Sequence, residues 1–334
     1  MSLLNSLEKT NKDNILILKD MPVVFLSYDE PNADENYDFL VKNHPTKRLV
    51  ERVHGVKGFD AAHKEAAKKA NAKRFFTIDA DCQVDKAIWW KTVELTKDIE
   101  RATLSWSSRN LVNGLVYGNG GIKLWYTDHV VNMRSHEAAS KDDGTNNIDF
   151  CWDAKNYKQM NNTYGVVVNN ATSKQAFRAG FREGIKMGLD QGHKVPVEDF
   201  KHKMYPANFA RWLIWMTIGR DVENGDWCMY GARLAAYKLY IENFDHTLIA
   251  DYDWFNEFWQ QQLEELQHGD YLESHSHKLL VDLKDNLKLP LTELNAEQSV
   301  WFKHVHINPN KGLGWPALLN QSVLPLYGFS LPTY

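Results

Sequence analysis

Two aspartates, Asp79 and Asp81, follow directly on the apolar run of residues 74–78. A short apolar run without polar alternation is typical of a strand that is buried on both faces of a sheet. Ligands of open α/β sheets bind at the carboxyl ends of the strands, where carboxylates spaced i, i+2 can reach one cation. Hard oxygen ligands suit magnesium or manganese, so the pair predicts a metal site. An aspartate turn that merely ends a strand is the alternative.

A first buried strand is expected over residues 21–28, followed by a polar loop and a helix. Tyr28 and Asp29 at its end could hold a base and a ribose by stacking and hydrogen bonding, or could be an ordinary loop aromatic and a helix cap. No Gly-x-Gly-x-x-Gly follows this strand, which argues against a dinucleotide fold. The chain also lacks the Gly-x-x-x-x-Gly-Lys of a P-loop.

Glycines precede two further expected elements of the chain. Lys57 and Gly58 stand before a predicted helix over residues 59–72, where free backbone N–H groups and a lysine suit a diphosphate. Gly120 and Gly121 lie in a glycine-rich turn that enters a strand. Glycines let a backbone approach a ligand closely, although a hairpin or bulge explains them equally well.

The second half of the chain is predicted to be mainly helical, and residues 84–100 in the first half also have a helical pattern. Thr172 or Ser173 is expected to cap the helix that follows it. That helix carries Arg178, Arg182 and Lys186, whose i, i+4, i+8 spacing places them on one face. The row is either a solvated surface or a track for phosphates. Further basic residues that could join it are Lys194, Lys201, Lys203 and Arg211.

Three late carboxylates are candidates for a catalytic base that accepts a proton from an acceptor hydroxyl. Asp221 and Asp226 stand at the mouth of a helix predicted from residue 226 to residue 241, and Asp199 is the third candidate. A hydroxyl becomes a good nucleophile when a group within hydrogen-bond reach accepts its proton. Helix capping is the alternative role of these side chains.

Two predictions concern the C-terminal hundred residues. Residues 251–288 are expected to form two helices, with an aromatic stripe from Trp254 to Trp259 that packs in the core. Farther on, His304 and His306 have the i, i+2 spacing that places both rings on one side of an extended segment. His306, or its neighbour His304, is a candidate for completing the metal shell, and an ordinary surface position is the alternative.

Composition bounds the class of protein. The 334 residues have a formal net charge of −4, but residues 241–300 hold 13 acidic and 3 basic side chains, so the rest of the chain is net +6. A nucleic-acid surface would therefore be a local patch. No apolar run reaches the length of a membrane span, and the first twenty residues lack the pattern of a secretory leader. Three widely spaced cysteines are typical of a reducing cytoplasm.

The order of these features resembles that of the GT-A glycosyltransferases, whose fold is a Rossmann-like, nucleotide-sugar-binding mixed sheet flanked by helices. In that family the Asp-x-Asp holds a divalent metal on the diphosphate of the donor, which the resemblance carries over to Asp79 and Asp81. Residues 57–63, Lys-Gly-Phe-Asp-Ala-Ala-His, are similar to the donor-binding stretch of the family. The usual Arg-Asn pair is replaced around His63, which the resemblance makes a donor-binding position.

More narrowly, residues 27–33 and 177–184 resemble segments of GT-A proteins from tailed bacteriophages. The resemblance covers roughly residues 21–240. It implies transfer of a sugar, arabinose or else glucose, from a UDP-sugar to 5-hydroxymethylcytosine in DNA, in the cytoplasm of a bacterial host. We expect three segments: an N-terminal extension over 1–20, a catalytic domain over 21–240, and a helical extension over 241–334 packed on the core.

Other activities fit part of the pattern. A glycosyltransferase with a protein or polysaccharide acceptor would have the same donor site. Phosphatases of the haloacid dehalogenase type also end a buried strand in Asp-x-Asp, but they normally carry Thr or Val two residues after the second aspartate, where this chain has Gln83. A tryptophan-rich binding or structural phage protein, in which both aspartates are inert, is the non-catalytic alternative.

Overall fold

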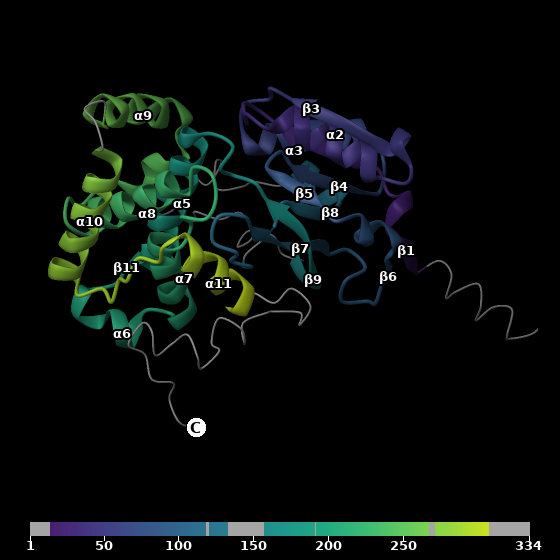
Figure 1. The fold of residues 1–334 in the computed structure, drawn as a ribbon. Coiled ribbons are helices and arrows are strands. Elements are labelled where there is room, and N and C mark those ends of the chain that lie inside the picture. Colours follow the sequence, from purple (N-terminus) through teal and green to yellow (C-terminus); the bar gives the residue numbers. More distant parts are fainter. Residues whose placement is uncertain (1–13, 118–119, 133–156, 191, 267–270, 307–334) are drawn as a thin grey trace, which may run out of the picture. The chain divides into compact units, whose positions relative to one another are not determined.

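The protein is a mixed α/β chain, and its computed structural model describes residues 14–117, 120–132, 157–190, 192–266 and 271–306 (Figure 1). Contacts between residues divide it into two compact units. Unit 1 consists of Met1–Arg109 with Tyr117–Val167, and unit 2 consists of Asn110–Val116 with Val168–Tyr334. The division differs from the expected boundary at residue 240, because the helices that precede residue 240 pack with those that follow it.

Unit 1 is built on a seven-stranded mixed sheet with the strand order β3-β2-β4-β8-β7-β9-β5, a Rossmann-like arrangement. The strands β3, β2 and β4 run parallel to one another, and β8 runs antiparallel to both β4 and β7. The strands of this sheet are β2 (Val23–Ser27), β3 (Val50–His54), β4 (Arg74–Asp79), β5 (Cys82–Val84), β7 (Thr103–Asn110), β8 (Ile122–Tyr126) and β9 (Tyr157–Val167).

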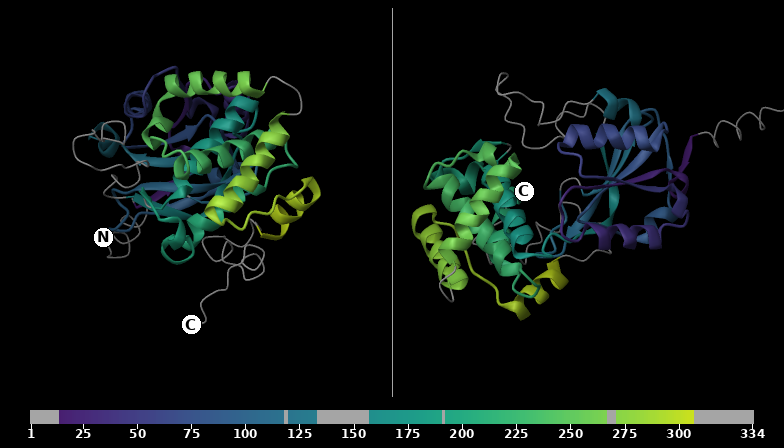
Figure 2. Two further views of the ribbon diagram at one scale, coloured as in Figure 1. Left: turned by 90° about the vertical axis from the view of Figure 1, so that its left-hand side faces the viewer. Right: turned by 90° about the horizontal axis from the view of Figure 1, so that it is seen from above.

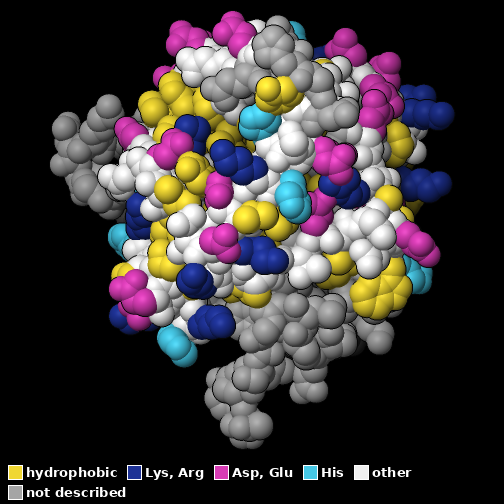
Figure 3. All heavy atoms as spheres, turned by 60° about the vertical axis from the view of Figure 1, so that its left-hand side comes forward, with side chains coloured by type: hydrophobic (Ala, Val, Ile, Leu, Met, Phe, Trp, Pro, Cys, Tyr) yellow, Lys and Arg dark blue, Asp and Glu magenta, His cyan; other side chains and the backbone are white. Residues whose placement is uncertain are grey.

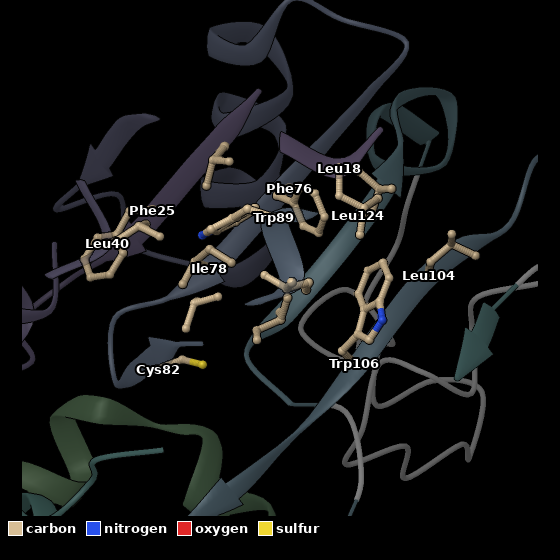
Figure 4. Close-up of a cluster of buried hydrophobic side chains, with 14 of the residues drawn as sticks. Leu18, Phe25, Leu40, Phe76, Ile78, Cys82, Trp89, Leu104, Trp106 and Leu124 are labelled. Carbon is tan, nitrogen blue, oxygen red and sulfur yellow. The ribbon is translucent and has the colours of Figure 1, made fainter. Parts of the chain in front are cut away.

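Helices cover both faces of this sheet. The connections are α2 (Ala33–Asn43), which joins β2 to β3, and α3 (Phe59–Ala70), which joins β3 to β4. They lie on opposite faces, as Figure 2 shows, and each closes its own apolar cluster. The larger cluster, on the α2 face, contains Phe76, Trp89 and Leu124 (Figure 4). The buried strand and the first βα connection expected from the sequence are therefore confirmed.

The prediction of a helix over residues 84–100 is wrong. A short 3-10 helix, η3 (Lys86–Trp90), follows β5, and the side chain of Asp85 caps it by accepting a hydrogen bond from the Ala87 N–H. The chain then forms β6 (Thr92–Glu94), which pairs with β1 (Ile15–Ile17) in a separate two-stranded sheet. Pairing with a strand so distant in sequence overrides the local helical pattern.

Unit 2 is mainly helical, and its centre is the contact between α5 and α8. A hydrogen bond from Gln175 N to the Thr172 side chain caps α5, as the sequence predicts. Aromatic rings of α9 pack on Phe177 of α5, which confirms the expected aromatic stripe in the core. The main helices are α5 (Ser173–Gly188), α6 (Phe200–Lys203), α7 (Pro206–Thr217), α8 (Gly225–Tyr240), α9 (Tyr252–Leu266), α10 (Tyr271–Leu287) and α11 (Ala296–His306).

Glycines allow α5 and α8 to approach closely. A methyl group at Gly180 would lie 1.8 Å from the Cys228 carbonyl oxygen, and one at Gly231 would lie 2.3 Å from the Phe177 carbonyl oxygen. The packing of α5 on α8 thus explains the glycines in the segment over residues 177–184.

No helix among the described ranges is long and apolar enough to cross a membrane.

Replacing Gly180 by alanine is expected to lower the free energy of unfolding by about 3 kcal/mol or more, because the added methyl group overlaps backbone atoms that cannot rotate away. Chemical denaturation measures this difference. Lys174→Ala on the same helix is the matched control and should stay within about 0.5 kcal/mol of the parent. Equal stability of the two variants would contradict the close packing.

Candidate functional site

The candidate site lies where the order of the strands reverses. From β2 the chain crosses through α2 to β3 on one side, and from β3 it crosses through α3 to β4 on the other side of β2. Such a switch point opens a crevice at the carboxyl ends of the two central strands, between helices on opposite faces. Asp79 ends β4 at this edge, level with Leu26 of β2. The edge is therefore the place where a nucleotide-type ligand is expected to bind.

The strand register places a lysine beside the first aspartate. Thr77 of β4 pairs with Lys123 of β8, so their side chains share a face, and Asp79 lies two residues farther along the same face. The Lys123 ammonium lies 3.8 Å from Asp79 Oδ2 and donates to the Gly120 carbonyl oxygen at 3.2 Å. The Lys123 side chain is only 4% exposed, and that of Asp79 is 42% exposed. Asp79 is thus the counter-ion of a buried cation.

Gly120 and Gly121 bring the loop before β8 against this edge. A side chain at Gly121 would come within 2.8 Å of Cys82 Cβ and 3.0 Å of Asp79 Cβ. A side chain at Gly120 would overlap the backbone of Ser108 at 2.5 Å. The packing of unit 1 itself therefore requires both glycines, whatever ligand approaches them.

His63 of α3 lies on the same face as Lys123 and Asp79. Its ring packs against the Phe59 ring, with the ring centres 3.9 Å apart, and its Nδ1–H donates to the Phe59 carbonyl oxygen at 2.9 Å. Burial lowers the pKa of His63 to about 4, an effect that the Phe59 carbonyl and Asp79 only partly oppose. The ring is therefore neutral at pH 7, and its buried Nε2 carries a lone pair that accepts no hydrogen bond from the part of the chain that the structure describes.

A buried amide of α2 fixes the turn that carries the two aspartates. Asn36, 1% exposed, donates from Nδ2 to the Ala80 carbonyl oxygen at 2.8 Å. Its Oδ1 accepts from the Gln83 side chain at 2.9 Å. These two bonds hold the turn from both sides and leave Asp81 half-buried at its tip.

The other predicted donor-site residues lie along the same edge of unit 1. Tyr28 follows β2 directly, and its backbone N–H donates to the Glu30 side chain at 2.7 Å, while Asp29 is exposed. Gly58 caps the N-terminus of α3 with φ at +100°, a conformation that favours glycine, and the exposed Lys57 precedes it. The N-terminal N–H groups of α3 and the Lys57 ammonium make this end of the edge attractive to anions.

The two aspartates fit a magnesium or manganese ion in their chemistry. Within the described ranges, no three His, Cys, Asp or Glu side chains converge as a complete metal site. Magnesium is commonly held by one or two carboxylates, with water and substrate phosphates filling the remaining positions. Asp79 and Asp81, both partly accessible, would supply these carboxylates.

The histidine prediction for the C-terminal segment is wrong in its geometry. His304 and His306 belong to α11, where residues two apart point in nearly opposite directions, and not to an extended segment. His304 is exposed, and the side chain of His306 lies outside the described residues.

The three candidate bases belong to unit 2 and differ in their partners. Asp221 pairs with Lys303 at 2.5 Å, and Asp199 pairs with Lys203 at 2.7 Å. Asp226, at the first turn of α8, lies 3.8 Å from Arg220 and is 52% exposed. Burial raises its pKa, which Arg220 opposes and two glutamates reinforce. A carboxylate with a raised pKa accepts a proton more readily, so Asp226 is the best of the three candidates.

A cleft of about 600 Å³ lies beside Arg220 in unit 2. Arg220 donates to Glu293, which also accepts from the buried Arg233 at 2.8 Å, and a second bond of Arg220 reaches Glu273 at 3.3 Å. Charged groups of both signs line the cleft and neutralise one another. The lining residues are Arg220, Glu273, Ser274, His277, Glu293, Leu294 and Asn295.

The basic side chains on one face of α5 are half-buried, whereas a solvated surface or a track for phosphates would be exposed. The Arg178 guanidinium lies 3.9 Å from the centre of the Tyr252 ring of α9, and Lys186 pairs with Glu183 at 3.2 Å. Arg182 is likewise half-buried. On the face drawn in Figure 3, Lys and Arg side chains lie interspersed with Asp and Glu among the coloured residues, and do not form one basic patch.

Sequence reasoning missed Lys123 and Asn36, because the only signal for either is the register of strands and helices distant in sequence. No family model matches the chain, and neither a curated protein nor a solved structure matches it. The functional argument for this protein therefore rests on the residues themselves.

Proposed function

We propose that this protein is a GT-A-type glycosyltransferase that moves a sugar, arabinose or else glucose, from a UDP-sugar to 5-hydroxymethylcytosine in DNA. The observation that carries the proposal is the edge of unit 1 at the carboxyl ends of β2 and β4. There a carboxylate pair, Asp79 and Asp81, lies beside the buried ammonium of Lys123 at a topological switch point. This combination suits a nucleoside diphosphate and its metal ion.

Each side chain at the edge has a role in binding the donor. Lys57, Lys123 and the N-terminus of α3 would attract the diphosphate, while the two aspartates would hold a magnesium or manganese ion. A divalent cation bound there supplies charge neutralisation as the diphosphate leaves. Asn36 keeps the aspartate turn in place, which limits the reorganisation needed when the donor binds.

The transfer also requires an acceptor hydroxyl to lose its proton. If the anomeric configuration inverts, Asp226 is the proposed base, because burial raises its pKa and its cationic partner, Arg220, lies 3.8 Å away. If the configuration is retained, this role disappears and Asp226 is a helix-terminus carboxylate. NMR of the donor and the product distinguishes these two courses.

The choice of DNA as the acceptor rests on the resemblance to the phage enzymes and on charge. Outside residues 241–300 the chain is net +6, and Lys201 is exposed in unit 2. Position 5 of cytosine points into the major groove, where an enzyme can reach it directly or after extruding the base. Arg178 contributes less than the sequence suggests, because its guanidinium packs on Tyr252.

The test is to incubate the protein with manganese, a panel of UDP-sugars and DNA with or without hydroxymethylcytosine, and then to weigh the nucleosides after digestion. A pentose or hexose mass on hydroxymethylcytosine alone is the expected result. Activity should fall steeply with rising salt, because phosphate contacts release counterions. Hydrolysis of the sugar nucleotide with no mass added to DNA would contradict DNA as the acceptor and leave a glycosyltransferase with another acceptor. A protein that neither binds nor turns over any nucleotide would contradict the proposal.

A further inference from the structure

The short two-stranded sheet of β1 and β6, labelled in Figure 1, has one buried face and one exposed face. Val93 belongs to the larger apolar cluster of unit 1, and Leu16, its partner in the sheet, packs against that cluster. Side chains alternate along a strand, so Ile15 and Ile17 point to the opposite face. There they are 44% and 43% exposed, and the sheet presents apolar side chains to the solvent.

Trp90 extends this exposed apolar face. Ile17 pairs with Thr92, and the same register continued by two residues brings Lys19 opposite Trp90. The Lys19 ammonium lies 6.0 Å from the centre of the Trp90 ring, and Trp90 is 67% exposed. The side chains of Ile15, Ile17 and Trp90 are called the ribbon patch below.

The backbone of β1 also has an open edge beside the ribbon patch. Leu18 N–H donates to the Lys91 carbonyl oxygen at 3.1 Å, so Leu18 is a hydrogen-bonded residue of this antiparallel ladder. Such residues alternate, which makes Leu16 the next one and turns the N–H groups of Ile15 and Ile17 away from β6. Within the described ranges, no strand pairs with β1 on that side.

The sequence of β1, Ile-Leu-Ile, reads the same in both directions. A two-fold axis through Leu16, perpendicular to the sheet, therefore places Ile15 of each copy opposite Ile17 of the other, on one face. In this register the Ile17 N–H of each copy donates to the Ile15 carbonyl oxygen of the other. The strand contains no lysine, glutamate or proline, the residues that commonly protect an edge from pairing.

The charges of the segments that carry the ribbon patch balance one another. Residues 14–20 and 90–94 contain two lysines and two carboxylates, Lys19, Lys91, Asp20 and Glu94. The Lys19 ammonium lies 3.7 Å from the Asp20 carboxylate, and Glu94 is on β6, across β1 from the open edge. A second copy of the same edge therefore meets apolar side chains without an excess of charge.

We propose that β1 is a dimerisation edge, through which two copies of this chain pair antiparallel and extend the sheet in the order β6-β1-β1-β6. The inference is independent of the proposed function. A standard interface takes about 20–30 residues from each partner, more than the ribbon patch supplies, so the dimer is weak and concentration-dependent. Within unit 1, β1 leads through η1 (Leu18–Asp20) to the start of β2, while the candidate site lies at the other end of that strand.

The first test is sedimentation velocity of the full chain over a wide range of concentrations. The parent should shift from monomer toward dimer as the concentration rises. Ile17→Lys should weaken self-association about 10-fold or more, because it sets a charge against the Ile15 side chain of the other copy. Val131→Lys is the matched control and should leave the association unchanged, because Val131, 56% exposed, lies on α4 (Thr127–Asn132).

The second test examines the register. Ile15→Glu and Ile17→Lys should each be monomeric alone, and mixing them should restore a heterodimer, visible by native mass spectrometry, since the two new charges of opposite sign face each other. A mixture of Ile17→Glu with Ile17→Lys is the matched control. Its opposite charges are not directly paired in the proposed register, so it should restore less heterodimer.

Several results would overturn the inference. A parent protein that stays monomeric at every concentration excludes the dimer, and a deletion of residues 1–13 that then dimerises would show that those residues occupy the edge instead. Unchanged self-association of a folded Ile17→Lys protein would place the contact elsewhere. Equal restoration by the two mixtures would exclude the antiparallel register about Leu16.

Discussion

Asp81→Ala is expected to reduce sugar transfer by a factor on the order of 10³, while the protein stays folded. The reason is that Asp81 would supply one of two protein ligands to the cation, whose charge neutralisation at the leaving diphosphate contributes several kcal/mol. Turnover at saturating UDP-sugar measures the loss. Manganese binding, followed by electron paramagnetic resonance, should weaken in the same variant and supplies a readout that does not depend on activity.

Asp81 is a better target than Asp79, because removing Asp79 also removes its ion pair with the buried Lys123 ammonium. A loss of activity in an Asp79 variant would therefore combine a folding defect with a defect in metal binding. Asp38→Ala, an exposed aspartate of α2, is the matched control and should keep full activity. Full turnover by Asp81→Ala, or by the parent protein in chelator, would remove the metal from the mechanism.

Glu293→Ala is expected to lower the free energy of unfolding by about 3–5 kcal/mol, because it leaves a buried arginine without its carboxylate. Glu293 accepts from Arg233, whose side chain is 1% exposed, and from Arg220. Without Glu293, the Arg233 charge stays buried, and its remaining hydrogen bonds to described residues go to neutral acceptors, the Met216 carbonyl and Ser276. Chemical denaturation at pH 7 measures the difference.

The same pair predicts a dependence of stability on pH. Burial would raise the pKa of Glu293, but Arg233 and Arg220 outweigh it and hold the pKa below the ordinary value of 4.5. A carboxyl whose pKa is lower in the folded state stabilises the protein above its unfolded pKa, and loses this effect as pH falls through the folded value. The parent should therefore lose stability below about pH 4.5, and Glu293→Gln should lack this component.

Glu242→Ala is the matched control for both measurements. Glu242 pairs with Lys238 on the surface, where its side chain is 47% exposed, and a pair of that kind is worth less than about 1 kcal/mol. If Glu293→Ala were no less stable than Glu242→Ala, Glu293 would not be needed to offset the cost of burying the Arg233 charge.

The sequence by itself determined the elements whose signals are local. An uninterrupted apolar run predicts β4 and places Asp79 at its end, as observed. The cap at Thr172 and the start of α5 follow from a hydroxyl residue before a helical pattern, because the bond closes within three residues. The aromatic stripe of α9 was likewise readable, since one face of a helix repeats every three to four residues.

Only the tertiary structure decided what depends on residues distant in sequence. The pairing of β1 with β6 replaces a predicted helix, and α11 replaces a predicted extended segment. Lys123 meets Asp79 through the register of β8 on β4, and His54 meets Ser27 through that of β3 on β2. Residue types and spacing mark the ends of strands, but strand order and register arise from packing of the whole sheet. The carboxylates at this site could therefore be predicted, while the cation beside them could not.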